Sequence, residues 1–141
     1  NLEIIAVLDK ETSQESRTEI IDACGNSIKV VEYDQEFNFA EKVNLGVVNS
    51  DGDYLLLLND DTEFISPDTI ETLMGLLEDP EVAMAGPMLL YEDGLIQSAG
   101  HILNPIPYDL YRHRSPQHVG AQNMLRVQRE VSGVIAACVL A

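Results

Sequence analysis

The chain has 141 residues, about one domain's length, and its 45% hydrophobic and 23% charged residues are ordinary for a globular protein. Its charge is unusual, because 24 Asp and Glu against 8 Lys and Arg leave a formal net charge of −16. A surface of that sign repels phosphate backbones and anionic lipid, which argues against nucleic acids and membrane surfaces as partners. An anionic ligand would need a metal ion or local donors to bind. No apolar run reaches the roughly 18 residues that a transmembrane helix requires.

The charge is also unevenly distributed. Residues 1–100 carry 22 acidic and 4 basic side chains, whereas residues 101–141 carry 2 acidic and 4 basic ones. These last four are Arg112, Arg114, Arg126 and Arg129. They form either an ordinary solvated face or a local counter-charge for a phosphate or an acidic acceptor, and the sequence leaves both readings open.

The two cysteines, Cys24 and Cys138, are too few for a disulfide framework and lack metal-ligand spacing. Cys138 lies in the apolar run 134–141 and is expected in the core, and a reduced, cytoplasmic setting follows as the simplest expectation. The first residues form a strand pattern without a basic signal-peptide region. Both ends interrupt apolar runs, which predicts an internal piece of a longer protein.

The first 86 residues alternate strand and helix patterns. Strands are predicted at 2–8, 27–32, 54–58 and 82–85. Capping boxes at Thr12/Glu15 and Asn38/Glu41 predict helices over 13–23 and from 39 onward, with Gly25 ending the first. Ser66-Pro67 predicts the start of a third. This alternation predicts an α/β fold, a Rossmann-like, mostly parallel sheet with helices on both faces.

The pattern changes after residue 86. Extended pieces are predicted at 89–91, 95–103 and 124–131. The intervening segment 104–122 is rich in Pro, His, Arg and Tyr and is predicted to be an irregular loop. Loops of that length are often functional.

Acidic and amide side chains follow two of the predicted strands. Asp9 comes after the first strand, and Asn59-Asp60-Asp61 comes directly after the strand 54–58. Ligands of open α/β sheets bind beyond the carboxyl ends of the strands, so these residues are expected to converge at one sheet edge. Hard oxygen ligands of this kind suit Mg²⁺ or Mn²⁺ shared with substrate phosphates. The alternative is a turn, which favours Asn and Asp.

Several other chemistries lack support. The sequence contains no G-x-G-x-x-G, P-loop or G-x-S-x-G motif, so a dinucleotide oxidoreductase, a P-loop enzyme and a serine hydrolase are not indicated. His101, His113 and His118 lack zinc-site spacing and are expected in loops or at the surface, with His113 kept as a substrate contact. A phosphoacceptor signalling domain would need a later lysine, and none follows Lys42.

Four segments together resemble glycosyltransferase family 2, and in particular its bacterial polysaccharide and O-antigen branch, which includes rhamnosyltransferase-like proteins. EIIAVLDKET at 3–12 is similar to the family's second strand and acidic loop. The segment 37–73 combines a helix ending in Asn-x-Gly, a Gly-Asp-Tyr strand and a DXD-like triplet. Segments 87–103 and 131–141 resemble later parts of that branch. The resemblance implies the GT-A fold and inverting, metal-dependent sugar transfer from a nucleotide-diphosphate donor.

The resemblance also implies roles for individual residues. Asp9 would contact the nucleobase, Asp61 would hold Mg²⁺ or Mn²⁺ on the diphosphate, and Asp60 would lie near the ribose or the metal. Asn59 stands where many relatives have Asp. Asn44 and Gly46 would shape the nucleotide pocket, with packing at the end of the helix and a helix cap as their structural alternatives.

Other parts of the resemblance concern the acceptor and the ends of the chain. Gln97, Ser98 and Gly100 would line the acceptor side, and Ile135 stands where the family usually has Thr. The family's opening strand and its general base are expected before the chain and beyond Ala141. Residues 1–141 are therefore expected to be one partial GT-A domain, with a nucleotide-binding half at 1–86 and an acceptor-side region at 87–141. The piece alone is expected to be inactive, with unpaired strand edges that favour self-association.

Two functions remain open. One is a glycosyltransferase of cell-surface polysaccharide synthesis in the cytoplasm, peripheral at the inner membrane, which uses a nucleotide-sugar donor and a carbohydrate or lipid-linked acceptor. The other is a noncatalytic nucleotide-sugar or metal-binding module, which would bind a nucleoside diphosphate without turnover.

Overall fold

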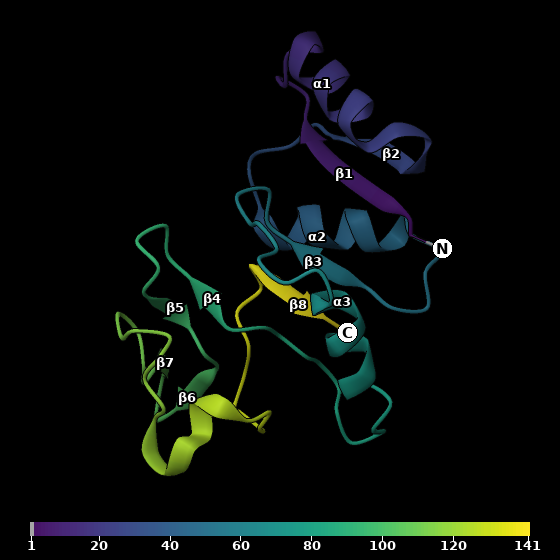
Figure 1. Ribbon diagram of the computed structural model, residues 1–141. Helices are drawn as coiled ribbons and strands as arrows, with labels where there is room; N and C mark the ends of the chain where they lie inside the picture. Colours follow the sequence, from purple (N-terminus) through teal and green to yellow (C-terminus); the bar gives the residue numbers. More distant parts are fainter. Residues whose placement is uncertain (1) are drawn as a thin grey trace. The chain divides into compact units, whose positions relative to one another are not determined.

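The structure is a computed structural model that describes residues 2–141 of a mixed α/β protein (Figure 1). The chain forms two compact units, the first extending to Leu55 and the second from Leu56 to Ala141. None of the helices described within residues 2–141 combines the length and the apolar character needed to cross a membrane.

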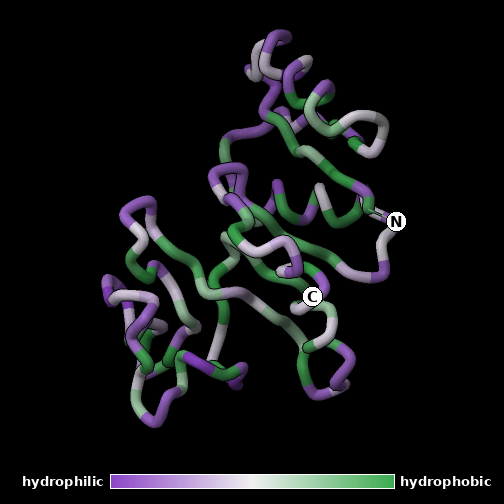
Figure 2. The backbone as a smooth tube through the Cα atoms, in the orientation of Figure 1, coloured by the Kyte–Doolittle hydropathy of each residue, from purple (hydrophilic) through white to green (hydrophobic). Residues whose placement is uncertain are grey.

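The first unit is built on a pair of parallel strands. β1 (Ile4–Asp9) pairs with β2 (Ile28–Tyr33), in register from Ile4 opposite Ile28 to Asp9 opposite Tyr33. Figure 1 shows α1 (Gln14–Cys24) and α2 (Phe39–Val48) on either side of this pair. Figure 2 shows β1 as largely hydrophobic, as expected for a strand covered on both faces.

Local capping signals set the ends of these helices. The Asn38 side chain caps α2 by accepting a hydrogen bond from the Glu41 amide at 3.3 Å, which confirms the predicted cap. The cap predicted at Thr12 is wrong by one residue, because the Ser13 hydroxyl accepts from the Ser16 amide instead. Gly25 follows the last turn of α1 as predicted.

The second unit begins with an antiparallel pair. β3 (Leu56–Leu58) pairs with β8 (Cys138–Leu140), and α3 (Thr69–Leu76) follows β3. A hydrophobic cluster of Leu73, Ala85 and Leu140 lies here, with Leu56, Leu76 and Leu77 packed against it. The strand predicted at 82–85 is reduced to a single bridge between Ala85 and Leu140. α3 begins at Thr69 rather than at Pro67, because the Ser66 carbonyl accepts from the Thr69 amide in a preceding turn.

Two short hairpins complete the second unit. β4 (Leu89–Leu90) pairs with β5 (Ile96–Ser98), and β6 (His101–Leu103) pairs with β7 (Pro107–Asp109). The prediction of an irregular loop over 104–122 is therefore wrong at β7, where a proline within the strand hides the pattern. The extended piece predicted at 124–131 is also wrong in part, because a 3₁₀ segment spans Ala121–Arg126.

The prediction of one mostly parallel sheet is not met in residues 2–141. The structure has one parallel and three antiparallel pairs of strands, each a separate two-stranded sheet. The apolar runs 54–58 and 134–141 contain the strands β3 and β8, of which only β8 is buried, and an unbroken apolar run carries no information on the direction of its partner.

The two thiols are expected to differ in reactivity. Cys138 is 1% exposed in β8, and burial raises the pKa of its thiol, whereas Cys24 is partly exposed at the end of α1. Only the thiolate attacks an alkylating reagent, so iodoacetamide at pH 8 should label Cys24 in the native chain and spare Cys138. Peptide mass spectrometry reads the sites, and the chain unfolded in guanidinium, where both should react, is the control. Equal native labelling would contradict the buried position of β8.

Candidate functional site

Asp9, the last residue of β1, has its side chain fixed by a lysine. The Lys42 ammonium on α2 donates to both carboxylate oxygens of Asp9, at 2.9 and 3.0 Å. The Asp9 side chain is still 48% exposed, whereas the Lys42 side chain is 19% exposed. The pair therefore leaves the carboxylate open to a ligand while holding its orientation.

Lys42 is a residue of this site that the sequence analysis missed. Its ammonium lies 5.8 Å from the ring centre of Tyr33 and 5.7 Å from that of Phe37, within cation–π range. Tyr33 is buried, and its hydroxyl donates a hydrogen bond to the Glu41 carboxylate. Burial first, and then this hydrogen bond, raise the pKa of Tyr33 to about 12. A signal was present, because Lys42 is one of only 4 basic residues among the first 100.

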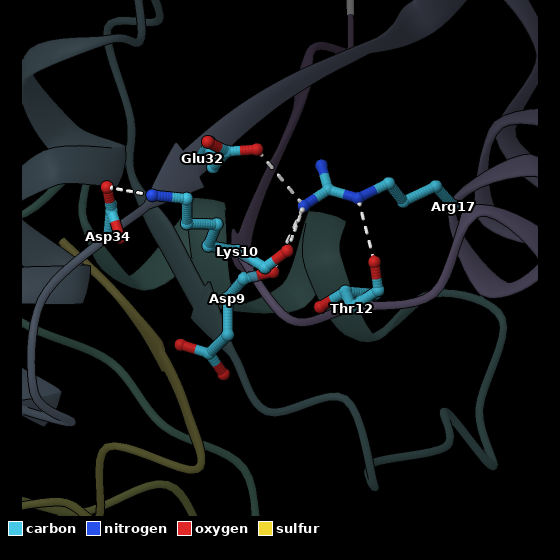
Figure 3. Close-up of polar contacts among 6 residues, drawn as sticks. All are labelled: Asp9, Lys10, Thr12, Arg17, Glu32 and Asp34. Atoms are coloured by element: carbon cyan, nitrogen blue, oxygen red, sulfur yellow. Dashed lines mark hydrogen bonds and ion pairs between the residues drawn. The ribbon is translucent and has the colours of Figure 1, made fainter.

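The backbone around Asp9 is held by a second cation, Arg17 of α1 (Figure 3). Its Nη2 donates to the Asp9 carbonyl at 3.1 Å and lies 3.3 Å from the Glu32 carboxylate, while its Nε donates to the Thr12 carbonyl at 3.1 Å. The Thr12 amide in turn donates to the Asp9 carbonyl at 2.9 Å. One guanidinium thus ties the loop after β1 to α1 and β2.

Replacing Arg17 by alanine is expected to lower the free energy of unfolding by about 1–3 kcal/mol, because part-buried carbonyl acceptors lose their donor. Amide exchange at Thr12 should also become faster. Lys10→Ala is the matched control: its ion pair with Asp34 has side chains 55% and 58% exposed, so the unfolding midpoint should barely change. Equal effects of the two variants would contradict the role of Arg17 in tying the loop after β1 to α1 and β2.

The acidic triplet Asn59-Asp60-Asp61 forms a tight turn after β3. The Thr62 amide donates to the Asn59 carbonyl at 3.3 Å, which closes the turn. The turn is anchored at both ends to Ala137, whose carbonyl accepts from the Asn59 amide at 2.9 Å and the Thr62 hydroxyl at 3.4 Å. Both Asp60 and Asp61 are exposed at the centre of the turn. Turn and ligand platform, the two readings of the sequence, are therefore compatible.

The chemistry of this donor set fits a divalent cation. Within residues 2–141 no three His, Cys, Asp or Glu side chains are grouped to hold a metal by themselves. Mg²⁺ does not need such a cage, because one or two carboxylates together with substrate phosphates and water complete its shell. Asp60 and Asp61 have no side-chain hydrogen bond or ion pair with the rest of the described chain, so both carboxylates are available.

Asn44 and Gly46 lie on α2. A Cβ atom at Gly46 would lie 3.3 Å from Cγ2 of Val7, so glycine permits close packing of α2 on β1. Asn44 is exposed. The cap considered for these residues is wrong, because α2 continues to Val48 and ends at Asn49. Their contribution to a nucleotide pocket stays a prediction, as does the convergence of Asp9 with the 59–61 turn, since the two belong to different units.

The second unit contains a cavity of about 300 Å³ beside the β6–β7 hairpin. The residues that line it are mainly polar and come from β5, β6, β7 and the segments that follow: Gln97, His101, Pro107, Tyr108, Asp109, Arg112 and Ile135. The cavity thus brings together Gln97, which was expected on the acceptor side, and Ile135, which stands where the family usually has Thr.

Asp109 organises one wall of this cavity. Its Oδ1 accepts from the Ser98 hydroxyl at 2.8 Å and the Ala99 amide at 3.1 Å, and its Oδ2 lies 3.3 Å from His101 Nε2. Its side chain is 9% exposed, and Ser98 is 1% exposed. Ser98 therefore holds Asp109 rather than lining the cavity. The sequence analysis missed Asp109, because its partners lie across a hairpin in a segment predicted to be a loop.

The three histidines have different surroundings. The expectation that His101 is a loop or surface residue is wrong, because it lies in β6 and pairs with Asp109. His113 is exposed and stacks on Tyr91, with ring centres 5.0 Å apart. His118 accepts a hydrogen bond from the Gly120 amide through Nδ1. A substrate contact through His113 stays a prediction.

Comparison with known proteins identifies the family. Residues 1–132 match Glycosyl transferase family 2, and the chain belongs to this family, which implies the GT-A fold. It is 30% identical over 122 residues to the uncharacterized protein y4gI of Sinorhizobium fredii, covering 85% of this chain and 13% of that protein. It is 32% identical over 71 residues to the O-antigen biosynthesis protein RfbC of Myxococcus xanthus, covering 50% of this chain and 6% of that protein. The chain thus spans a small part of both relatives. No solved structure was found to match it.

Proposed function

We propose that the protein containing this chain transfers a sugar, with inversion, from a nucleotide-diphosphate donor to an acceptor hydroxyl in the synthesis of a cell-surface polysaccharide. Family membership supports sugar transfer, and the distant relative named for O-antigen biosynthesis supports the polysaccharide product. The observation that carries the proposal is the anchored turn after β3, which holds the Asp60 and Asp61 carboxylates exposed and without a side-chain partner among residues 2–141.

In this proposal the residues of the chain divide the donor between them. Asp9, oriented by Lys42, accepts hydrogen bonds from the nucleobase, and Asp60 lies near the ribose or the metal. Asn59, Asn44 and Gly46 complete the donor pocket. Asp61 would hold Mg²⁺ or Mn²⁺, which would supply electrostatic stabilisation of the departing diphosphate. The base that takes the proton from the acceptor hydroxyl is not assigned to a residue of this chain.

The proposed role of the cation also explains how so acidic a chain accepts an anionic donor. A net charge of −16 repels a diphosphate, and the turn places two of the carboxylates that make up this charge at the proposed donor site. A divalent cation held there by Asp61 would supply the positive charge that offsets this repulsion. Binding of the donor is therefore expected to need Mg²⁺ or Mn²⁺.

The experiment is a binding and turnover screen on the full-length protein. Saturation-transfer NMR against a panel of nucleotide sugars, with Mn²⁺ or with EDTA, identifies the donor, and release of the nucleoside diphosphate measures transfer to added polysaccharide precursor. Metal-dependent binding with turnover supports the proposal. Metal-dependent binding without turnover on any acceptor would favour a noncatalytic nucleotide-sugar module, and no binding of any nucleotide sugar would contradict both. The cytoplasmic location, peripheral at the inner membrane, is part of the same proposal.

A further inference from the structure

Arg112 lines the cavity of the second unit and lacks a carboxylate partner. Its Nε donates to the Tyr91 hydroxyl at 2.6 Å, and its guanidinium carbon lies 5.7 Å from the centre of the Tyr91 ring. These two contacts fix the direction of the side chain. Among the described residues no hydrogen bond engages its two Nη groups, so the fork that recognises planar anions is available.

The missing partner is notable in a chain with 24 carboxylates. The Lys and Arg ion pairs in residues 2–141 all belong to the first unit and join Lys10 to Asp34, Arg17 to Glu32 and Lys42 to Asp9. Three of the four arginines of the second unit instead donate to neutral oxygens. These contacts are Arg112 to the Tyr91 hydroxyl, Arg126 to the Gln117 carbonyl and Arg129 to the Ala99 carbonyl. Of these arginines Arg112 is the one that lines the cavity, and its guanidinium forms no ion pair within the described residues.

The carboxylate in the cavity wall keeps its negative charge, but among the described residues it forms no ion pair with Arg112. Asp109 is 9% exposed, and its two oxygens are engaged by Ser98, the Ala99 amide and His101. Within the described part of the chain no other Asp or Glu lines the cavity. The amide of Gln97 and the hydroxyl of Tyr108 add neutral donors to the same wall.

We propose that this cavity binds an anionic group of the acceptor, a phosphate or a carboxylate, with Arg112 as its charged anchor. The proposal rests on the function proposed above and names the acceptor class: a hydroxyl-bearing molecule that also carries an anion. The donor diphosphate is assigned to the turn after β3, and among the described residues no member of that turn lines the cavity. A 300 Å³ cavity has room for one anionic group or one sugar ring, not for a whole nucleotide sugar.

The first test measures anion binding without any sugar transfer. The chain is titrated with inorganic phosphate, with glucuronate as a carboxylate and with glucose as a neutral ligand, at constant ionic strength, following the Arg112 Nε–H and Gln97 amide signals by NMR. Phosphate or glucuronate should shift these signals saturably, and glucose should not. Arg112→Gln should lower the affinity for the anion by about tenfold, because a pair of charge-assisted hydrogen bonds is lost.

Arg114→Gln is the matched control. It removes the same charge at a position two residues from Arg112, and Arg114 is not among the described residues that line the cavity. Its effect should stay below about twofold, as expected for exposed charges in salt. The anion affinity of Arg112→Lys should lie between those of the unmodified chain and Arg112→Gln, because lysine keeps the charge and lacks the two parallel donors of the guanidinium. Equal weakening by Arg112→Gln and Arg114→Gln, or no anion-dependent shift, would overturn the proposal.

The second test separates acceptor from donor in the full-length protein. Arg112→Gln should raise the KM for the acceptor and leave the KM for the donor unchanged, whereas a rise in the donor KM alone would overturn the assignment to the acceptor. The two tests also separate this proposal from the proposed function. Absence of transfer in the unmodified protein refutes the function, while the phosphate titration still decides whether the cavity is an anion site.

Discussion

Replacing Asp61 by asparagine is expected to weaken metal-dependent binding of a nucleoside diphosphate by about 100-fold. A direct ligand should matter at least as much as a residue that only hydrogen-bonds to a metal ligand, whose loss lowers metal affinity by about 10- to 100-fold. Asparagine keeps the size of the side chain and one carbonyl oxygen but removes the negative charge that holds a hard cation. The side chain is exposed, so the thermal unfolding midpoint should not change. Calorimetric titration with a nucleoside diphosphate in the presence of Mn²⁺ measures the effect.

Glu63→Gln supplies the control for this prediction. Glu63 is exposed two residues beyond Asp61, outside the turn closed by Asn59 and Thr62, and the variant changes the net charge by the same amount. Its affinity should stay within about twofold, because exposed charges are screened. Unchanged affinity in folded Asp61→Asn would rule out the metal role of Asp61. Equal loss in both variants would reduce that role to a general charge effect.

The parts of the structure that the sequence predicted depend on neighbouring residues. The cap of α2 at Asn38 and the end of α1 at Gly25 were predicted, because each signal lies within a few residues of the helix that it ends. The capping-box spacing from Thr12 to Glu15 predicts Thr12 as the cap, but the adjacent Ser13 offers the same hydroxyl chemistry and caps the helix instead. Such errors are of one or two positions and leave the element in place.

The parts that the sequence did not predict depend on pairing across long separations. β3 meets β8 about eighty positions later, and antiparallel pairing follows from the path of the intervening chain rather than from either apolar run. The same holds for the candidate sites. The Asn59–Asp61 turn was found from adjacent residues, whereas the Asp9–Lys42 pair needs α2 to pack on β1, and Asp109 meets His101 only across a hairpin.

Gly100 shows how a residue singled out for function can have a structural reason of its own. It was expected on the acceptor side, and it directly precedes His101 of β6. Its φ angle of +89° lies in a region that side chains disfavour, and a Cβ atom there would lie 2.5 Å from Cγ1 of Val131. Glycine is therefore required for backbone conformation and for packing, whether or not the residue also faces a substrate.

Gly100→Ala is expected to lower the free energy of unfolding by about 2–5 kcal/mol, from backbone strain together with overpacking against Val131. Gly94→Ala separates the two causes, because Gly94 has a similar φ of +80° but open space where its Cβ would lie. Its cost, about 1–3 kcal/mol, gives the backbone contribution alone. Denaturant unfolding measures the free energy of unfolding of both variants, and Val131→Ala with Gly100→Ala/Val131→Ala completes a double-mutant cycle. Alanine at position 131 should recover only the part of the Gly100→Ala loss that exceeds the Gly94→Ala loss. A cost at Gly100 no larger than at Gly94 would mean that Val131 moves aside without penalty and that packing places no demand on this glycine.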